Sequence, residues 1–84
     1  MIKEYVFNPQ GVCSREMVFT YDDETKTLIK FEVTGGCGGN LKGIKALIEG
    51  EKIENIISKL NGIKCGYKNT SCPDQISKGL SKIL

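Results

Sequence analysis

The chain has 84 residues, which is enough for one small domain over residues 1–84. Its 12 basic and 10 acidic residues are scattered and leave a net charge of +2, too small and too dispersed to indicate nucleic-acid binding. No apolar run approaches the roughly 20 residues of a membrane span. The start of the chain, MIKEYVF, also lacks the pattern of a secretory signal. We therefore expect a cytoplasmic protein with no membrane partner.

The first half of the sequence alternates apolar and polar side chains, as strands do. The alternation covers residues 2–7, 16–21 and 27–33, so we expect three strands. The sets expected to share a face are Tyr5 with Phe7 (opposite Ile2 and Val6), Met17 with Phe19 and Tyr21, and Ile29 with Phe31 and Val33. The acidic segment 22–26 lacks the ligand spacing of a calcium loop and is interpreted as a solvated hairpin turn.

After the glycine-rich segment 35–39 the apolar period changes to that of helices. Asn40 is the expected N-cap of a first helix that ends at Gly50, and Asn61-Gly62 closes a second. Pro73 is expected at the first position of a third helix, with Cys72 as its N-cap. The three apolar stripes are Leu41, Ile44, Leu47 and Ile48; Ile53, Ile56, Ile57 and Leu60; and Ile76, Leu80, Ile83 and Leu84. This order predicts an α+β fold: a small antiparallel sheet of about three strands followed by three helices packed on one face.

The four cysteines are the candidate site residues, and all of them fall in connections between elements. They are Cys13, Cys37, Cys65 and Cys72, separated by 24, 28 and 7 residues without any CxxC pair. In the cytoplasm such a set favours a metal or redox site over structural disulfides. The chain has no histidine, so a metal would have to be bound mainly by thiolates. Cys37 and Cys72 precede helices, whose free amides and dipole stabilise a thiolate.

Several functions remain open on these residues alone. The leading one is an all-sulfur site for zinc, iron or an iron–sulfur cluster. Thiol redox chemistry is the second, with Cys72 as the attacking thiol and Cys65 as the resolving one. The third is a plain interaction domain in which the cysteines are small buried apolar residues. The glycines of GGCGGNLKG could also cradle an anion, but they lack the GK[ST] ending of a P-loop. No acid–base pair appears, so the chain is not expected to be catalytic alone.

The pentapeptide Thr70-Ser71-Cys72-Pro73-Asp74 resembles the signature of the TSCPD domain family. GVCS at 11–14, GGCGGNLKGI at 35–44 and Cys65-Gly66 are similar to the four-cysteine, stand-alone branch of that family, so the likeness covers nearly the whole chain. Related domains end the adenosylcobalamin-dependent (class II) ribonucleotide reductases, and stand-alone members are often labelled ribonucleoside-diphosphate reductases. A chain of 84 residues is too short for such a reductase. The resemblance therefore implies an accessory part, with a ribonucleotide reductase or another protein as partner.

A more distant resemblance is to the U-type scaffold proteins of iron–sulfur cluster assembly. Their order of elements is similar, and three of their cysteines converge at one end of a sheet. The resemblance assigns these positions to Cys13, Cys37 and Cys72 and implies the same fold. Arg15 stands where the scaffold has an aspartate, and Ser71 where it has a histidine. Cys65 has no counterpart there, and it could complete a set of four thiolates.

Overall fold

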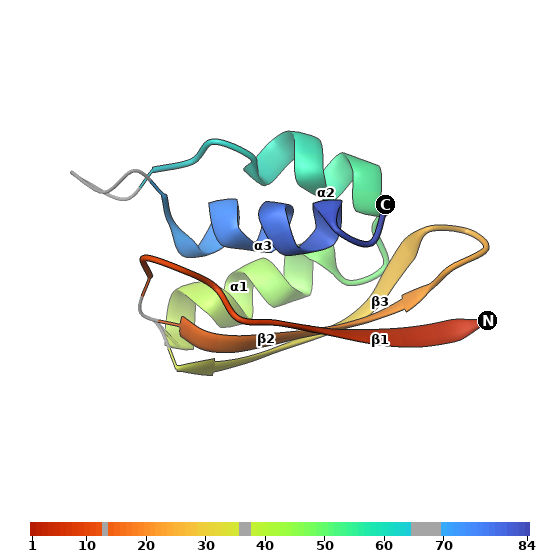
Figure 1. Cartoon of the computed structure of the whole chain (residues 1–84), viewed down its shortest axis with the longest axis horizontal. Helices are drawn as coiled ribbons and strands as arrows, with labels where there is room; N and C mark the ends of the chain where they lie inside the picture. The colour runs from red at the N-terminus through yellow and green to blue at the C-terminus, as the bar shows by residue number, and fades with distance from the viewer. Residues whose placement is uncertain (13, 36–37, 65–69) are drawn as a thin grey trace.

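The structure is a computed structural model that describes residues 1–12, 14–35, 38–64 and 70–84. Three strands come first: β1 (Ile2–Phe7), β2 (Ser14–Asp22) and β3 (Thr27–Gly35). They form an antiparallel sheet in the order β1-β2-β3. Three helices follow: α1 (Gly38–Ile48), α2 (Ile53–Leu60) and α3 (Cys72–Ser81), all on the same side of the sheet (Figure 1). The α+β architecture expected from the sequence is confirmed.

The sheet presents its aromatic face to the helices. Tyr5 pairs with Phe19, which in turn pairs with Phe31, so the register places three aromatic residues in one row across the strands. The rings of Phe19 and Phe31 stack with centroids 5.5 Å apart, and both side chains are fully buried. Ile2 and Val6 point to the other face and are about half exposed. The alternation predicted for the first two strands is therefore correct.

The alternation predicted for β3 is wrong at its start, where a β-bulge intervenes. Thr20 pairs with Lys30 and Tyr21 with Leu28, which leaves Ile29 as an extra residue with no partner on β2. Because of this extra residue, the side chains before the bulge point to the face opposite the one that simple alternation predicts. Leu28 is consequently fully buried, whereas Ile29, which was expected to face inward, is 43% exposed.

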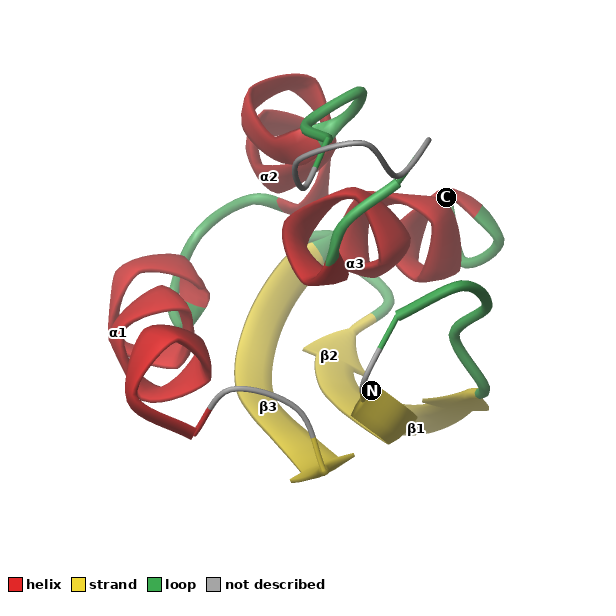
Figure 2. Ribbon diagram, turned by 90° about the vertical axis from the view of Figure 1, so that its left-hand side faces the viewer, coloured by secondary structure: helices red, strands yellow, loops and turns green. Residues whose placement is uncertain are grey.

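The helices do not cover the sheet equally. α1 runs along β3, α3 lies over β2, and α2 packs mainly on α3 (Figure 2). Because α2 is one layer further from the sheet, its apolar stripe fills the space between the helices rather than lying flat on the strands. The buried core joins all these elements: Met17, Phe19, Leu28, Phe31, Ile48, Ile53, Ile56, Ile76 and Leu80.

Gly79 explains how closely α3 approaches the sheet. A Cβ atom at this position would lie 2.8 Å from Cε2 of Phe19 and 2.9 Å from ring atoms of Phe7. Real Cβ atoms do not approach ring carbons so closely, so a side chain here would push the helix away. The close packing of α3 on β1 and β2 therefore depends on a glycine in the middle of the helix, despite its cost in helix propensity.

Two predictions about α1 need correction. The helix begins at Gly38, two residues before the expected cap Asn40, so Gly38 and Gly39 belong to its first turn, where amides need no partner within the helix. Leu47 is 76% exposed, because Leu41, Ile44 and Ile48 define the inner face and Leu47 lies at its margin. The second helix ends at Asn61-Gly62 as predicted. No helix in the described ranges is both long and apolar enough to span a membrane.

Candidate functional site

The start of α3 is capped by Ser71 and not by Cys72, as the sequence had suggested. The Ser71 hydroxyl accepts a hydrogen bond from the amide of Asp74 at 3.2 Å and donates one to the carbonyl of Ile63 at 2.6 Å. A hydroxyl oxygen is a much better acceptor than a thiol sulfur, which is the physical reason for this arrangement. Cys72 and Pro73 are therefore the first two residues of the helix.

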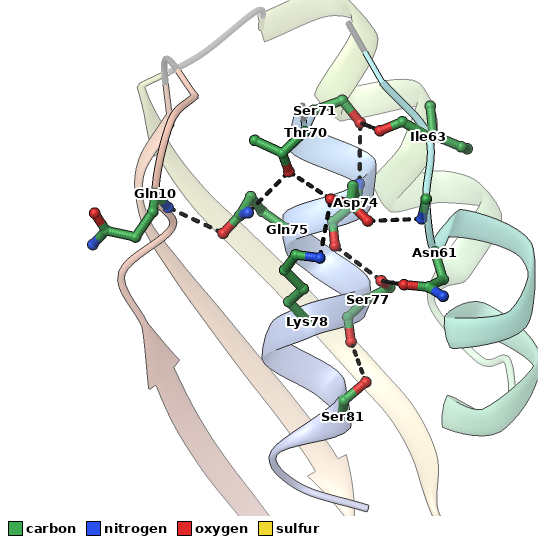
Figure 3. A network of polar contacts seen from close by, with 11 residues as sticks. Gln10, Asn61, Ile63, Thr70, Ser71, Asp74, Gln75, Ser77, Lys78 and Ser81 are labelled. Carbon is green, nitrogen blue, oxygen red and sulfur yellow. Dashed lines mark hydrogen bonds and ion pairs between the residues drawn. The ribbon is translucent and has the colours of Figure 1, made fainter. Parts of the chain in front are cut away.

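Asp74 is the central residue of a buried polar network at the same helix start (Figure 3). Its carboxylate accepts hydrogen bonds from the amide of Gly62 at 2.7 Å and from the hydroxyl of Thr70 at 2.6 Å. Lys78, one turn along the helix, lies 3.3 Å away, while the Asp74 side chain is only 2% exposed. The Thr70 hydroxyl, then the Gly62 amide and Lys78, keep the pKa of Asp74 below its ordinary value despite burial. The charged carboxylate thus holds both ends of the segment between residues 62 and 70.

Gln75 extends this network to the connection between β1 and β2. Its side-chain amide donates to the Thr70 hydroxyl at 2.9 Å, and its carbonyl accepts from the backbone amide of Gln10 at 3.0 Å (Figure 3). Gly11, with φ +72°, lies against the Thr70 methyl group, 3.3 Å from where a Cβ of Gly11 would be. The loop that precedes β2 is therefore held against the start of α3.

Cys72 is the one polar member of the Thr70–Asp74 pentapeptide whose side chain makes none of the hydrogen bonds of this network. Its half-buried thiol packs against the core, and its Sγ lies 3.4 Å from the hydroxyl oxygen of Ser14 at the start of β2. Thr70, Ser71 and Asp74 hold the surrounding backbone, and Pro73 occupies the first turn, where its missing amide costs nothing. The pentapeptide thus combines a rigid support with one thiol.

Cys13, Cys37 and Cys65 lie outside the described residues. Described residues lie within two positions of each of these cysteines, and three contacts connect those residues with one another or with the start of α3. Ser14, next to Cys13, touches Cys72 and pairs with Gly35, two residues before Cys37. Ile63, two residues before Cys65, accepts the hydrogen bond from Ser71. The described neighbours of all four cysteines therefore meet at one place, where the start of α3 faces the start of β2 and the end of β3.

Within the described ranges, the other segments rich in possible ligands give no candidate site. The part of the chain that the structure describes, which includes only Cys72 of the cysteines, holds no group of three cysteine or acidic side chains able to bind a metal together. In the acidic segment 22–26, Asp22 accepts a hydrogen bond from the amide of Glu24 at 2.9 Å. The segment is thus the hairpin turn predicted from its composition.

Sequence reasoning missed Asp74, Gln75 and Gly62 as parts of the site. A signal was available for Asp74, since an acidic side chain three residues after a serine cap is typical of a capping box. No signal in the sequence connects Gly62 to Asp74, because the two meet only when α2 and α3 pack together.

Comparison with known proteins gives a match to a family model. The model of the TSCPD domain family matches residues 3–84. Neither the curated proteins nor the solved structures contain a significant match. The likeness to U-type scaffold proteins therefore stays a prediction.

Proposed function

Because this chain belongs to the TSCPD domain family, whose model matches residues 3–84, we propose that its four cysteines form a metal-binding site. Cys13, Cys37, Cys65 and Cys72 would bind zinc, iron or an iron–sulfur cluster through sulfur alone. The observation that supports this most is the meeting of the residues beside all four cysteines, through Ser14 with Cys72, Ser14 with Gly35, and Ser71 with Ile63.

The surroundings of Cys72 fit a thiolate ligand. Its sulfur lies at the first turn of α3, where the positive end of the helix dipole favours negative charge. The neighbouring Ser14 hydroxyl is within reach to donate a hydrogen bond to a sulfur anion. The absence of histidine from the sequence makes the proposed donor set one of soft ligands, which suits zinc and iron–sulfur clusters.

A metal would also help to stabilise a fold this small. A domain of this size buries only about 60–65% of the surface that its unfolded chain exposes, and small domains often add a metal or disulfides. The proposed ligands come from segments far apart in the sequence, so binding would close long loops of the unfolded chain. The role of such a metal would be structural or regulatory, since four cysteine ligands would leave no open coordination position for a substrate.

The proposed partner follows from the family. The domain would act as an accessory module of a ribonucleotide reductase or of another protein. Its metal site would then set the shape of the end of the domain at which the β1–β2 connection, the end of β3 and the start of α3 meet.

The test is metal analysis with an absorption spectrum after anaerobic purification. We expect one tightly bound zinc without colour, or a brown protein with iron and sulfide. Cys72→Ser should release the metal and lower the melting temperature. The matched control is Ser14→Ala, which changes a contact of the same sulfur without removing a ligand and should keep the metal.

The opposite results are equally informative. Unchanged metal content in Cys72→Ser would contradict the shared site. Metal-free protein that forms a disulfide between Cys65 and Cys72 on oxidation would favour thiol redox chemistry. Metal-free protein with unreactive thiols would favour a plain interaction domain.

A further inference from the structure

A groove lies between β3 and α1, away from the cysteines. It has a volume of about 730 Å³, within the range of ligand-binding clefts. Its walls are the last part of β3 and the side of α1 that faces it, two elements that run alongside each other in Figure 2. The lining combines apolar and charged side chains: Phe31, Val33, Leu41, Ala46, Lys30, Lys42, Lys45, Glu32 and Glu49.

The first half of the β3 edge already carries an added segment of the chain itself. Leu28 donates its amide to the carbonyl of Glu51 at 2.9 Å and accepts from the amide of Gly50 at 2.7 Å. Thr27 forms an isolated antiparallel bridge with Lys52. This edge therefore accepts an extended segment in antiparallel orientation.

The second half of the β3 edge has no such segment among the described residues. Within the sheet β3 pairs only with β2, and the outward direction of the Phe31 amide is known from its bond to Glu49. Val33 is two residues further along a regular part of the strand, so its amide and carbonyl point outward as well. No backbone hydrogen bond from the rest of the described chain reaches them. The edge from Phe31 to Gly35 is about 16 Å long at 3.3 Å per residue.

The carboxylate of Glu49 shows that this groove can bind an acidic side chain. Oε2 of Glu49 accepts a hydrogen bond from the amide of Phe31 at 2.9 Å and lies 3.5 Å from the Lys45 ammonium. An outward-facing amide and a lysine on α1 thus bind one carboxylate together. Lys42 is exposed one turn earlier on the same side of α1, and no ion pair engages it among the described residues.

We propose that an extended acidic peptide segment of a partner protein binds in this groove as a fourth, antiparallel strand on β3. Its backbone pairs with Val33 and with the carbonyl of Phe31, which no backbone amide of the described residues outside the sheet reaches. The side chains of the paired residues point into the groove, since residues opposite each other in a ladder share a face. Glutamate or aspartate there meets Lys42, which lines the groove beside the ion pair of Lys45 with Glu49, while the backbone bonds provide the affinity that is independent of sequence. This inference does not rest on the proposed metal site.

The test uses the full 84-residue chain and a five-residue peptide that alternates glutamate with valine and has blocked ends. We expect amide chemical shifts of Phe31, Val33 and Lys42 to move on titration in a nuclear magnetic resonance experiment. Hydrogen exchange of the Val33 amide should slow when the peptide is bound. A peptide with lysine in place of glutamate should bind at least about tenfold more weakly, and so should a peptide N-methylated at the glutamates.

Two variants locate the site. Val33→Pro removes an outward amide that β2 does not use, and it should abolish binding. If that variant does not fold, Lys42→Glu reverses one charge of the groove and should weaken binding at least about tenfold. Lys59→Glu on α2 is the matched control, because Lys59 lies outside the groove, and it should bind like the unchanged chain.

Several results would overturn the proposal. The first is the absence of chemical-shift changes on β3 and α1 at millimolar peptide. The second is that the lysine peptide or the N-methylated peptide binds as tightly as the glutamate peptide, and the third is that Lys42→Glu binds the glutamate peptide as tightly as the unchanged chain does. Dimerisation through the β3 edge in solution would also overturn it, since a second copy would then be the occupant.

Discussion

The replacement Asp74→Asn tests whether the buried carboxylate holds the site together. Asparagine keeps the shape of the side chain but removes the charge and one of the two acceptor oxygens. The two hydrogen bonds from Gly62 and Thr70, at 2.7 and 2.6 Å, then change from charge-assisted to neutral or are lost. Each such change costs about 1 kcal/mol, and the loss of a charge in the first helical turn adds about 0.5 kcal/mol. We expect the free energy of unfolding to fall by about 2–3 kcal/mol.

The assay is thermal and urea unfolding at pH 7. For a domain of this size, a loss of 2–3 kcal/mol lowers the melting temperature by roughly 10–20 °C. Glu54→Gln is the matched control, because Glu54 is an exposed acid in the first turn of α2 and reports the helix-dipole part alone. A cost for Asp74→Asn no larger than that of Glu54→Gln would refute the reasoning.

The pH dependence provides an independent check of the same prediction. The pKa of Asp74 is lower in the folded chain than the ordinary value of 3.8, so the unfolded chain binds the proton more readily. The stabilisation is therefore complete above pH 3.8 and is lost as the pH falls below it through the folded pKa. The difference in unfolding free energy between the unchanged chain and Asp74→Asn should shrink over that acidic window. A difference that stays constant down to pH 2 would show that the charge is not its source.

Two further predictions concern packing. Gly79→Ala should lower the unfolding free energy by about 1–3 kcal/mol, because overlap with the two phenylalanine rings exceeds the gain of about 1 kcal/mol in helix propensity. If urea unfolding shows that the variant is more stable than the unchanged chain, α3 can move away from the rings without cost. Leu28→Ala should cost about 2–5 kcal/mol and Ile29→Ala less than about 1 kcal/mol, because the bulge buries the first side chain and exposes the second. The reverse order in the same assay would contradict the bulge.

Local patterns of side chains predicted most of the fold. The alternation of residues 16–21 and the stripe of Ile53, Ile56 and Leu60 depend on neighbours a few positions away, and the structure agrees with both. Ile29 and Leu47 were misplaced for a different reason. A bulge in β3 and the exact facing of α1 are decided by partners on other elements, which the local pattern does not contain.

The candidate site was predicted in part. The sequence identified four cysteines in connections, and the structure describes Cys72 at the start of α3 as expected, although Ser71 and not Cys72 caps the helix. It could not connect Asp74 with Gly62, or Gln75 with Gln10, because these pairs are 12 and 65 residues apart. Such bonds form only after the helices and the β1–β2 connection have packed.

The sequence by itself therefore determined the family, the order of strands and helices, and the residue types that could bind a metal. These features follow from short-range periodicity and from a signature of five adjacent residues. Only the tertiary structure decided which side chains support the thiol of Cys72. It also decided that one part of the β3 edge, beside two lysines, carries no added segment among the described residues. Burial and hydrogen bonding between distant segments depend on how the layers pack, and no local pattern encodes that packing.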